Sequence, residues 1–129
     1  MNEKKIFMTS VAGINFRATS EDCGPIIGYV ERDLTNEHDP RAVGVYRPNG
    51  ELLGFVAAKD LDSFYEFKGE GFDKMVYTGN IKSAKRYGKE FLIGNIAIIR
   101  SENEEELSDI ANKYLSDDNF NLYGKTILS

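Results

Sequence analysis

The alternation of apolar and polar positions predicts short β-strands over residues 5–57. Apolar side chains alternate with polar ones or stand beside glycine, and clusters of Gly, Pro, Asn and Asp separate the runs. The predicted strands cover residues 5–16, 26–33, 42–47 and 52–57. Between the last two, Pro48-Asn49-Gly50 is typical of a hairpin turn, because proline fixes φ and Asn-Gly accepts a positive φ.

The pattern changes to a helical period at residue 58. Residues 58–68 carry apolar side chains at helical spacing, and Gly69 follows them as a stop signal. Two longer strands are predicted over residues 74–88 and 89–100, joined near Tyr87 and Gly88. Residues 101–118 predict an amphipathic helix, whose start from Ser101 to Glu104 has the spacing of a capping box.

Together these elements predict a mainly β fold of the α+β type. Six short strands, several with an internal glycine, indicate a small, partly closed β-barrel, since interior glycines let short strands bend tightly. One helix lies between the fourth and fifth strands, and a second follows the last strand. A chain of 129 residues is the size of one domain. We expect the barrel in residues 1–100, and an acidic helix and tail in residues 101–129 that pack on it or extend from it.

The cysteine count and the short apolar runs favour a protein inside the cell. Cys23 is the only cysteine, so no internal disulfide can form, which favours a reducing compartment. No apolar run approaches the about 18 residues that a membrane span needs. The first 16 residues imitate a signal peptide, but Thr9 and Ser10 interrupt the apolar stretch. We therefore expect a cytoplasmic protein with no membrane partner.

The net charge of −5 is unevenly distributed. Residues 101–129 carry two basic and seven acidic side chains, which accounts for the whole excess. Residues 74–100 carry six basic side chains against the single acid Glu90. The chain therefore has a basic segment followed by an acidic one, and the average hides both.

His38 and Asp39 stand side by side before the third predicted strand. A catalytic pair is one interpretation, but adjacent residues rarely reach that geometry, and no nucleophile motif accompanies them. A metal site would have one His and one Cys in the whole chain, leaving only carboxylates to complete it. Local features favour a turn at Asp39-Pro40 with an exposed His38. We expect no catalytic residue and no metal.

The remaining motifs give no support for a cofactor, and they allow two interpretations of the basic run. The sequence contains neither a G-x-G-x-x-G nor a P-loop pattern, so no cofactor is expected. In the basic run, Lys82 and Arg86 would share one strand face, and Lys85 and Lys89 the other. This run could bind phosphates, or it could guard a solvated strand edge against aggregation.

Aromatic residues are expected mostly in the core. They are Tyr46, Phe55, Phe64, Tyr65, Phe67, Phe72, Tyr77, Tyr87 and Phe91. Phe16, beside Asn15 and Arg17 at the end of the first predicted strand, could instead present its ring at a loop rim for base stacking. From the residues alone we expect Phe16 in the core as well.

The order of these motifs resembles the HIRAN domain family. The segments that carry the resemblance are VAGINFR (11–17), IIGYVERDLTNEHDPRAVGVYRPNGELLGFV (26–56) and the helix at 58–68. Positions in register with the family pattern are Asn36, Asp39, Ala42, Val43, Val45, Gly50, Gly54, Phe55 and Val56. The resemblance covers about residues 7–100 and implies a six-stranded barrel of the OB or SH3-like type. Members occur fused to SWI/SNF-type ATPases, and also alone in bacteria and phages, as this chain would be.

For function, the resemblance implies binding of single-stranded DNA at its 3′ end. Phe16 and His38 would stack on bases, and Asp39 would accept a hydrogen bond from the terminal 3′-hydroxyl. Basic and polar groups hold the phosphates in the family, and here the sequence departs from it. Asn15 stands where an arginine is expected, with Arg17 nearby, and Phe55 replaces a histidine. Lys59 lies one position from the expected lysine.

We therefore predict a non-enzymatic module for single-stranded DNA in repair, replication or phage-related processes. The predicted DNA-binding residues are Asn15, Phe16, Arg17, Asn36, His38, Asp39, Phe55, Lys59, Lys82, Lys85, Arg86 and Lys89. One alternative is an adaptor that binds a protein partner through the barrel groove or the acidic C-terminal helix. Another is a metal-dependent hydrolase that uses Asp39 and other carboxylates.

Overall fold

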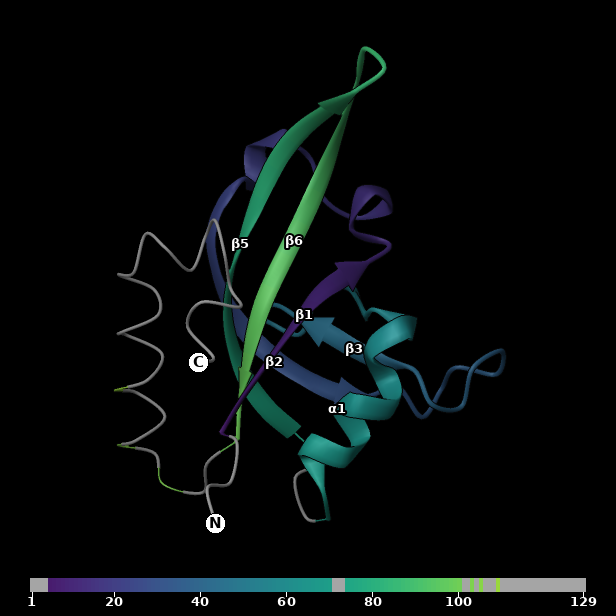
Figure 1. Cartoon of the computed structure of the whole chain (residues 1–129), viewed down its shortest axis with the longest axis vertical. Helices are drawn as coiled ribbons and strands as arrows, with labels where there is room; N and C mark the ends of the chain where they lie inside the picture. Colours follow the sequence, from purple (N-terminus) through teal and green to yellow (C-terminus); the bar gives the residue numbers. More distant parts are fainter. Residues whose placement is uncertain (1–4, 71–73, 101–102, 104, 106–108, 110–129) are drawn as a thin grey trace.

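Six antiparallel strands close into a barrel in the computed structural model, which describes residues 5–70 and 74–100 together with residues 103, 105 and 109 (Figure 1). The strands are β1 (Ile6–Ala12), β2 (Gly24–Arg32), β3 (Val43–Tyr46), β4 (Leu52–Val56), β5 (Lys74–Arg86) and β6 (Lys89–Ile99). Their order around the barrel is β1-β4-β3-β2-β5-β6. The predicted six-stranded, mainly β barrel is confirmed.

Short helical turns connect the strands. They are η1 (Ile14–Phe16), η2 (Ser20–Asp22) and η3 (Ala58–Asp60), and η3 leads into the helix α1 (Leu61–Lys68) between β4 and β5, as predicted. Of the helix predicted over 101–118, the structure describes only residues 103, 105 and 109, of which 105 and 109 are helical, and the rest lies outside the described residues. The protein partner suggested for this helix stays a prediction. In the described part of the chain, no helix is long and apolar enough to cross a bilayer.

The barrel interior is filled by the inward-facing residues of all six strands. Val45, Ile96 and Ile98 are completely buried at its centre. The helix α1 closes one side with Phe64, whose ring meets that of Phe7 at 5.8 Å between centroids in an edge-to-face contact. Strands come unusually close at Gly54, where a Cβ would lie 2.5 Å from the carbonyl oxygen of Ala12. This close approach is the expected role of a strand glycine in a small barrel.

The first strand is shorter than predicted. It ends at Ala12, because Gly13 adopts a left-handed conformation with a φ of 77° and directs the chain into η1. Apolar residues continue through Ile14 and Phe16, so the sequence reads as one longer strand. A three-residue turn is too short to leave a period of its own.

The β5–β6 hairpin extends beyond the barrel. Pairing of β2 with β5 ends at Ile81, and pairing of β1 with β6 ends at Asn95. In the described structure residues 82–86 and 89–93 therefore pair only with each other. We call residues 82–93 the ribbon, and Figure 1 shows it rising from the top of the barrel, in green.

Candidate nucleic-acid interface

Phe16 is an exposed aromatic residue on η1. Ile14 anchors this turn in the core, whereas the Phe16 side chain is 92% exposed and Arg17 beside it is exposed as well. The expectation that Phe16 belongs to the core is wrong. Its ring is open to solvent and free to stack on a planar ligand, since stacking needs an accessible aromatic face.

Asn15 fixes η1 to the base of the ribbon. Its Nδ2 donates a hydrogen bond to the carbonyl oxygen of Leu92 at 3.1 Å, and the Leu92 N–H donates to its Oδ1 at 2.7 Å. The amide thus occupies both polar groups of one β6 residue, as a neighbouring strand would. This pairing holds Phe16 and Arg17 beside the ribbon. An open pocket of about 240 Å³ lies beside this contact, lined by Asn15, Ala18, Thr19, Ser20, Glu90, Phe91 and Leu92.

The ribbon carries its basic side chains on both faces. The ladder places Arg86 directly opposite Lys89, and Lys85 directly opposite Glu90. Directly opposite residues share a face, so Lys89 lies with Lys82 and Arg86, as alternation along β5 requires. The prediction that Lys82 and Arg86 share a face is confirmed, whereas the pairing of Lys89 with Lys85 is wrong. The reason is the two-residue turn at positions 87–88, because alternation along one strand does not continue across a turn. Lys89 pairs with Arg86 and therefore lies on the same face as Arg86.

Tyr87 occupies the tip of the ribbon. Its side chain is 95% exposed, so its expected place in the core is wrong, while the predicted turn at Tyr87 and Gly88 is confirmed. The Arg86 guanidinium carbon lies 5.9 Å from the centre of the Tyr87 ring. Of the other expected core aromatics, Phe64 and Tyr77 are buried, Tyr46, Phe55, Tyr65, Phe67 and Phe91 are half-buried, and Phe72 lies outside the described residues.

His38 and Asp39 lie in the loop of residues 33–42 that connects β2 to β3. The Asn36 Oδ1 accepts hydrogen bonds from the backbone N–H groups of His38 at 3.0 Å and Asp39 at 2.9 Å. The Asp39 Oδ1 in turn accepts one from the Arg41 N–H at 3.0 Å. The predicted turn is therefore confirmed, and Asn36 is the residue that holds its shape. Both His38 and Asp39 are exposed.

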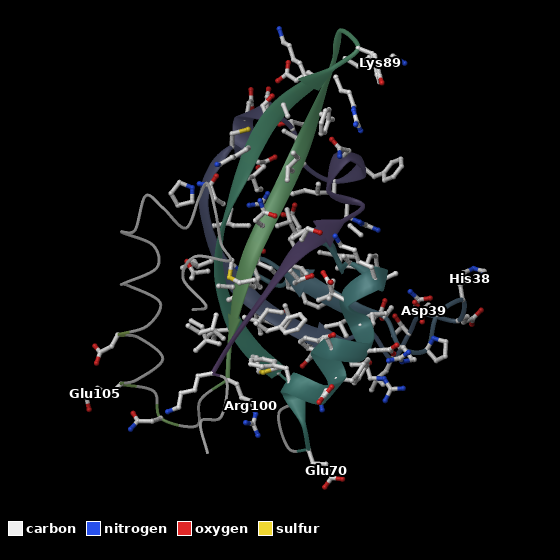
Figure 2. All side chains as sticks on the ribbon, in the orientation of Figure 1. His38, Asp39, Glu70, Lys89, Arg100 and Glu105 are labelled. Atoms are coloured by element: carbon white, nitrogen blue, oxygen red, sulfur yellow. The ribbon has the colours of Figure 1, made fainter. Side chains whose placement is uncertain are left out.

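The predicted site residues form two groups rather than one. Figure 2 shows His38 at the outer end of its loop, with Asp39 nearer the barrel, whereas Lys89 lies at the tip of the ribbon, well apart from both. Phe55 is half-buried in β4, directly opposite Ala12, and Lys59 is exposed on η3. The structure thus brings Asn15, Phe16 and Arg17 to the ribbon and leaves the His38 loop separate.

Sequence reasoning missed an aromatic cluster on the outer barrel wall. The rings of Tyr29 and Tyr46 stack at 5.1 Å between centroids, and the Lys74 Nζ lies 4.2 Å from the centre of the Tyr29 ring. Burial, and then the nearby carboxylates of Asp33 and Glu31, raise the pKa of Tyr46 above its usual value. The three positions are far apart in sequence, so only a known strand register could have revealed the cluster.

Within the described residues, no three His, Cys, Asp or Glu side chains gather in a way that could hold a metal ion. The sequence offered no ligand spacing of that kind either.

Comparison with known proteins gives one structural match. No family model matches the chain, and no curated protein matches it. Among solved structures the chain is similar to the HIRAN domain of human HLTF, with a TM-score of 0.38 and 16% sequence identity. The match covers 84% of this chain and 88% of that domain. HIRAN is also the family that the sequence motifs resemble.

Proposed function

We propose that this chain is a nucleic-acid-binding module that takes single-stranded DNA and has no catalytic activity of its own. One observation carries the proposal: Phe16 is almost fully exposed on a turn that Asn15 fixes to the base of a basic ribbon. An exposed ring stacks on any base, and the neighbouring cations bind the phosphates on either side of it.

The size of these effects is sufficient for a measurable affinity. One base stacked on an aromatic side chain contributes roughly 1–3 kcal/mol. Arg17 is next to Phe16, and Lys82, Arg86 and Lys89 share one face of the ribbon. Each phosphate contact adds affinity that falls with salt, because binding releases counterions.

We further propose that the His38 loop reads the 3′ end. The Asp39 Oδ1 holds the Arg41 N–H, while its Oδ2 accepts no hydrogen bond from any described residue. This oxygen can accept a hydrogen bond from a free 3′-hydroxyl, and a 3′-phosphate would be repelled by the carboxylate. The exposed imidazole of His38 offers a second surface for stacking. Because the loop and Phe16 are separate groups, the two parts of the proposal can be tested separately.

The test is fluorescence anisotropy of a labelled single-stranded oligonucleotide at salt concentrations of about 50 and about 200 mM. We expect Phe16→Ala to weaken binding by about tenfold, from the loss of one stacked base. Ile27→Ala, which truncates a half-exposed apolar residue on the outer face of β2, is the matched control and should change little. Equal affinities for wild type and Phe16→Ala would contradict the proposal.

End recognition is measured with the same oligonucleotide carrying either a 3′-hydroxyl or a 3′-phosphate. Wild type should prefer the hydroxyl, and Asp39→Asn should lose most of that preference by ceasing to repel the phosphate. His38→Ala should weaken binding to both ends alike. If wild type binds both ends equally, the ribbon and Phe16 act without any reading of the end.

A further inference from the structure

The tip of the ribbon has features that turn formation does not require. Tyr87 and Gly88 form a two-residue turn in which both residues have a positive φ, 53° for Tyr87 and 77° for Gly88. Such turns favour Asn or Asp before Gly, because a left-handed backbone is unfavourable for bulky residues. A tyrosine at this position does not help the turn, and the residue is 95% exposed. An unfavourable residue held at an exposed tip points to a role in binding.

The charges near the tip are also unfavourable in the free protein. Arg86 and Lys89 are directly opposite each other, which destabilises a strand pair. Among the described residues, no ion pair joins Lys82, Arg86 or Lys89 to an acid. The one acid of the ribbon, Glu90, accepts a hydrogen bond from the Ser83 hydroxyl at 2.5 Å. A polyanion would relieve the repulsion between the cations while its bases covered the exposed ring.

The distance from Phe16 to the tip matches a short stretch of single strand. Phe16 is held at Leu92 through its neighbour Asn15, and Gly88, in the turn before β6, is four residues along the chain from Leu92. At about 3.4 Å per strand residue this span is roughly 14 Å. Successive bases of a stacked strand rise by about 3.4 Å along its axis. The span therefore corresponds to about four nucleotides.

We propose that Tyr87 is a second base-stacking site, about four nucleotides away from Phe16 along the same single strand. The intervening phosphates pass along the ribbon, where Lys82, Arg86 and Lys89 share one face. The inference rests on the proposed function and deepens it, because it sets the length of the strand that the protein covers. A strand too short to reach the tip binds only at Phe16.

The experiment compares oligothymidylates of about three nucleotides, which are too short to reach the tip, and of about ten nucleotides, which lie within the site sizes of small barrel domains. Tyr87→Asn is the central variant, because asparagine suits the left-handed turn and removes the ring without changing the charge. It should melt at the same or a higher temperature than wild type. It should bind the short oligonucleotide as wild type does and the long one about tenfold more weakly. Tyr87→Phe, which keeps the ring, should bind both as wild type does.

The outcomes separate this inference from the proposed function. If the short oligonucleotide binds and Phe16→Ala abolishes that binding, but Tyr87→Asn binds the long one like wild type, the second site is wrong and the first stands. If neither oligonucleotide binds, or Phe16→Ala has no effect, the proposed function itself fails. A third oligonucleotide carries a duplex arm beside the single strand. If Tyr87→Asn weakens the binding of this oligonucleotide only, the tip contacts a duplex end and the single-strand path is overturned.

Discussion

Tyr77 shows how one buried polar group joins separate strands of the barrel. It is almost completely buried on β5, and its hydroxyl donates a hydrogen bond to the carbonyl oxygen of Tyr46 on β3 at 3.0 Å. Strand β2 lies between these two strands, so the bond crosses it. Burial raises the pKa of Tyr77 to about 12, against a smaller opposing effect of Arg47. A hydroxyl this far from water is retained for the bond that it makes.

The raised pKa predicts a loss of stability at alkaline pH. The unfolded chain releases the Tyr77 proton near its ordinary pKa of 10, while the folded protein keeps it until about 12. The contribution is therefore complete below pH 10 and falls as the pH rises towards 12. The total is up to about 3 kcal/mol, since each pKa unit corresponds to about 1.4 kcal/mol.

Urea unfolding of wild type and Tyr77→Phe at a series of pH values measures this loss. At neutral pH the variant should be about 1 kcal/mol less stable, from the missing hydrogen bond. Above pH 10 its stability should fall less steeply than that of wild type, so the two curves converge and then cross. Because the two proteins differ only at position 77, the comparison isolates Tyr77. Parallel curves would contradict the assignment.

Asn15 acts as a positioning residue in the structure, although the sequence placed it among the DNA contacts. Asn15→Ala should remove two hydrogen bonds to Leu92 and lower the free energy of unfolding by about 1–2 kcal/mol. The readout is amide hydrogen exchange at Leu92, which should become faster in the variant without DNA. Arg17→Ala is the control, because it changes a neighbouring exposed cation and should leave exchange at Leu92 unchanged. Unchanged exchange in Asn15→Ala would disprove the positioning role.

At the scale of elements, strands were predictable because their signals are periodic or strongly local. Alternation located all six strands, and Pro48-Asn49-Gly50 and Tyr87-Gly88 marked two of the turns. The element that exposes Phe16 was not predictable, because η1 has three residues and its apolar side chains continue the pattern of β1. A rule that places aromatics in the core then gives the wrong result for both Phe16 and Tyr87.

The His38 loop is an element whose shape depends on side chains rather than on a strand ladder. The Arg32 side chain donates two hydrogen bonds to the carbonyl oxygen of Pro40, at 3.0 and 2.9 Å, and Asn36 caps His38 and Asp39. The residue types predicted a turn here, and the hydrogen bonds follow from the ability of Asn and Asp to accept from nearby backbone groups. The residue types of this loop and its hydrogen bonds therefore describe the same turn.

Asn36→Ala tests whether this turn is needed for reading the end. The variant loses the acceptor for two backbone N–H groups, so Asp39 should no longer be held in place. We expect the preference for a 3′-hydroxyl over a 3′-phosphate to fall severalfold, while binding that depends on Phe16 persists. Glu37→Ala, at an exposed position of the same loop, should keep the preference. If Asn36→Ala keeps it as well, end recognition does not depend on this turn.

At the scale of the whole molecule, the arrangement of charge opposes the proposed ligand while the local surface favours it. The formal net charge is −5, and residues 101–129 carry all of the excess. Residues 74–100, which include the ribbon, carry six basic side chains and one acid. A distant polyanion interacts with the net charge of the whole protein, whereas one within a Debye length of the surface interacts mainly with the local charge. Binding should therefore depend on salt in two ways, through counterion release at the ribbon and through repulsion by the acidic segment.

Neutralising part of the acidic segment separates these two effects. Replacing Glu102, Glu104, Glu105 and Glu106 by Gln removes four negative charges and raises the net charge to −1. At about 50 mM salt the variant should bind the oligonucleotide severalfold more tightly than wild type, and at about 200 mM the difference should shrink, because the Debye length falls. The same four positions changed to Asp keep the charge and should behave as wild type. A gain that persists undiminished at the higher salt, or that the Asp variant shares, would show that the acidic segment acts through contacts of its side chains rather than through its charge.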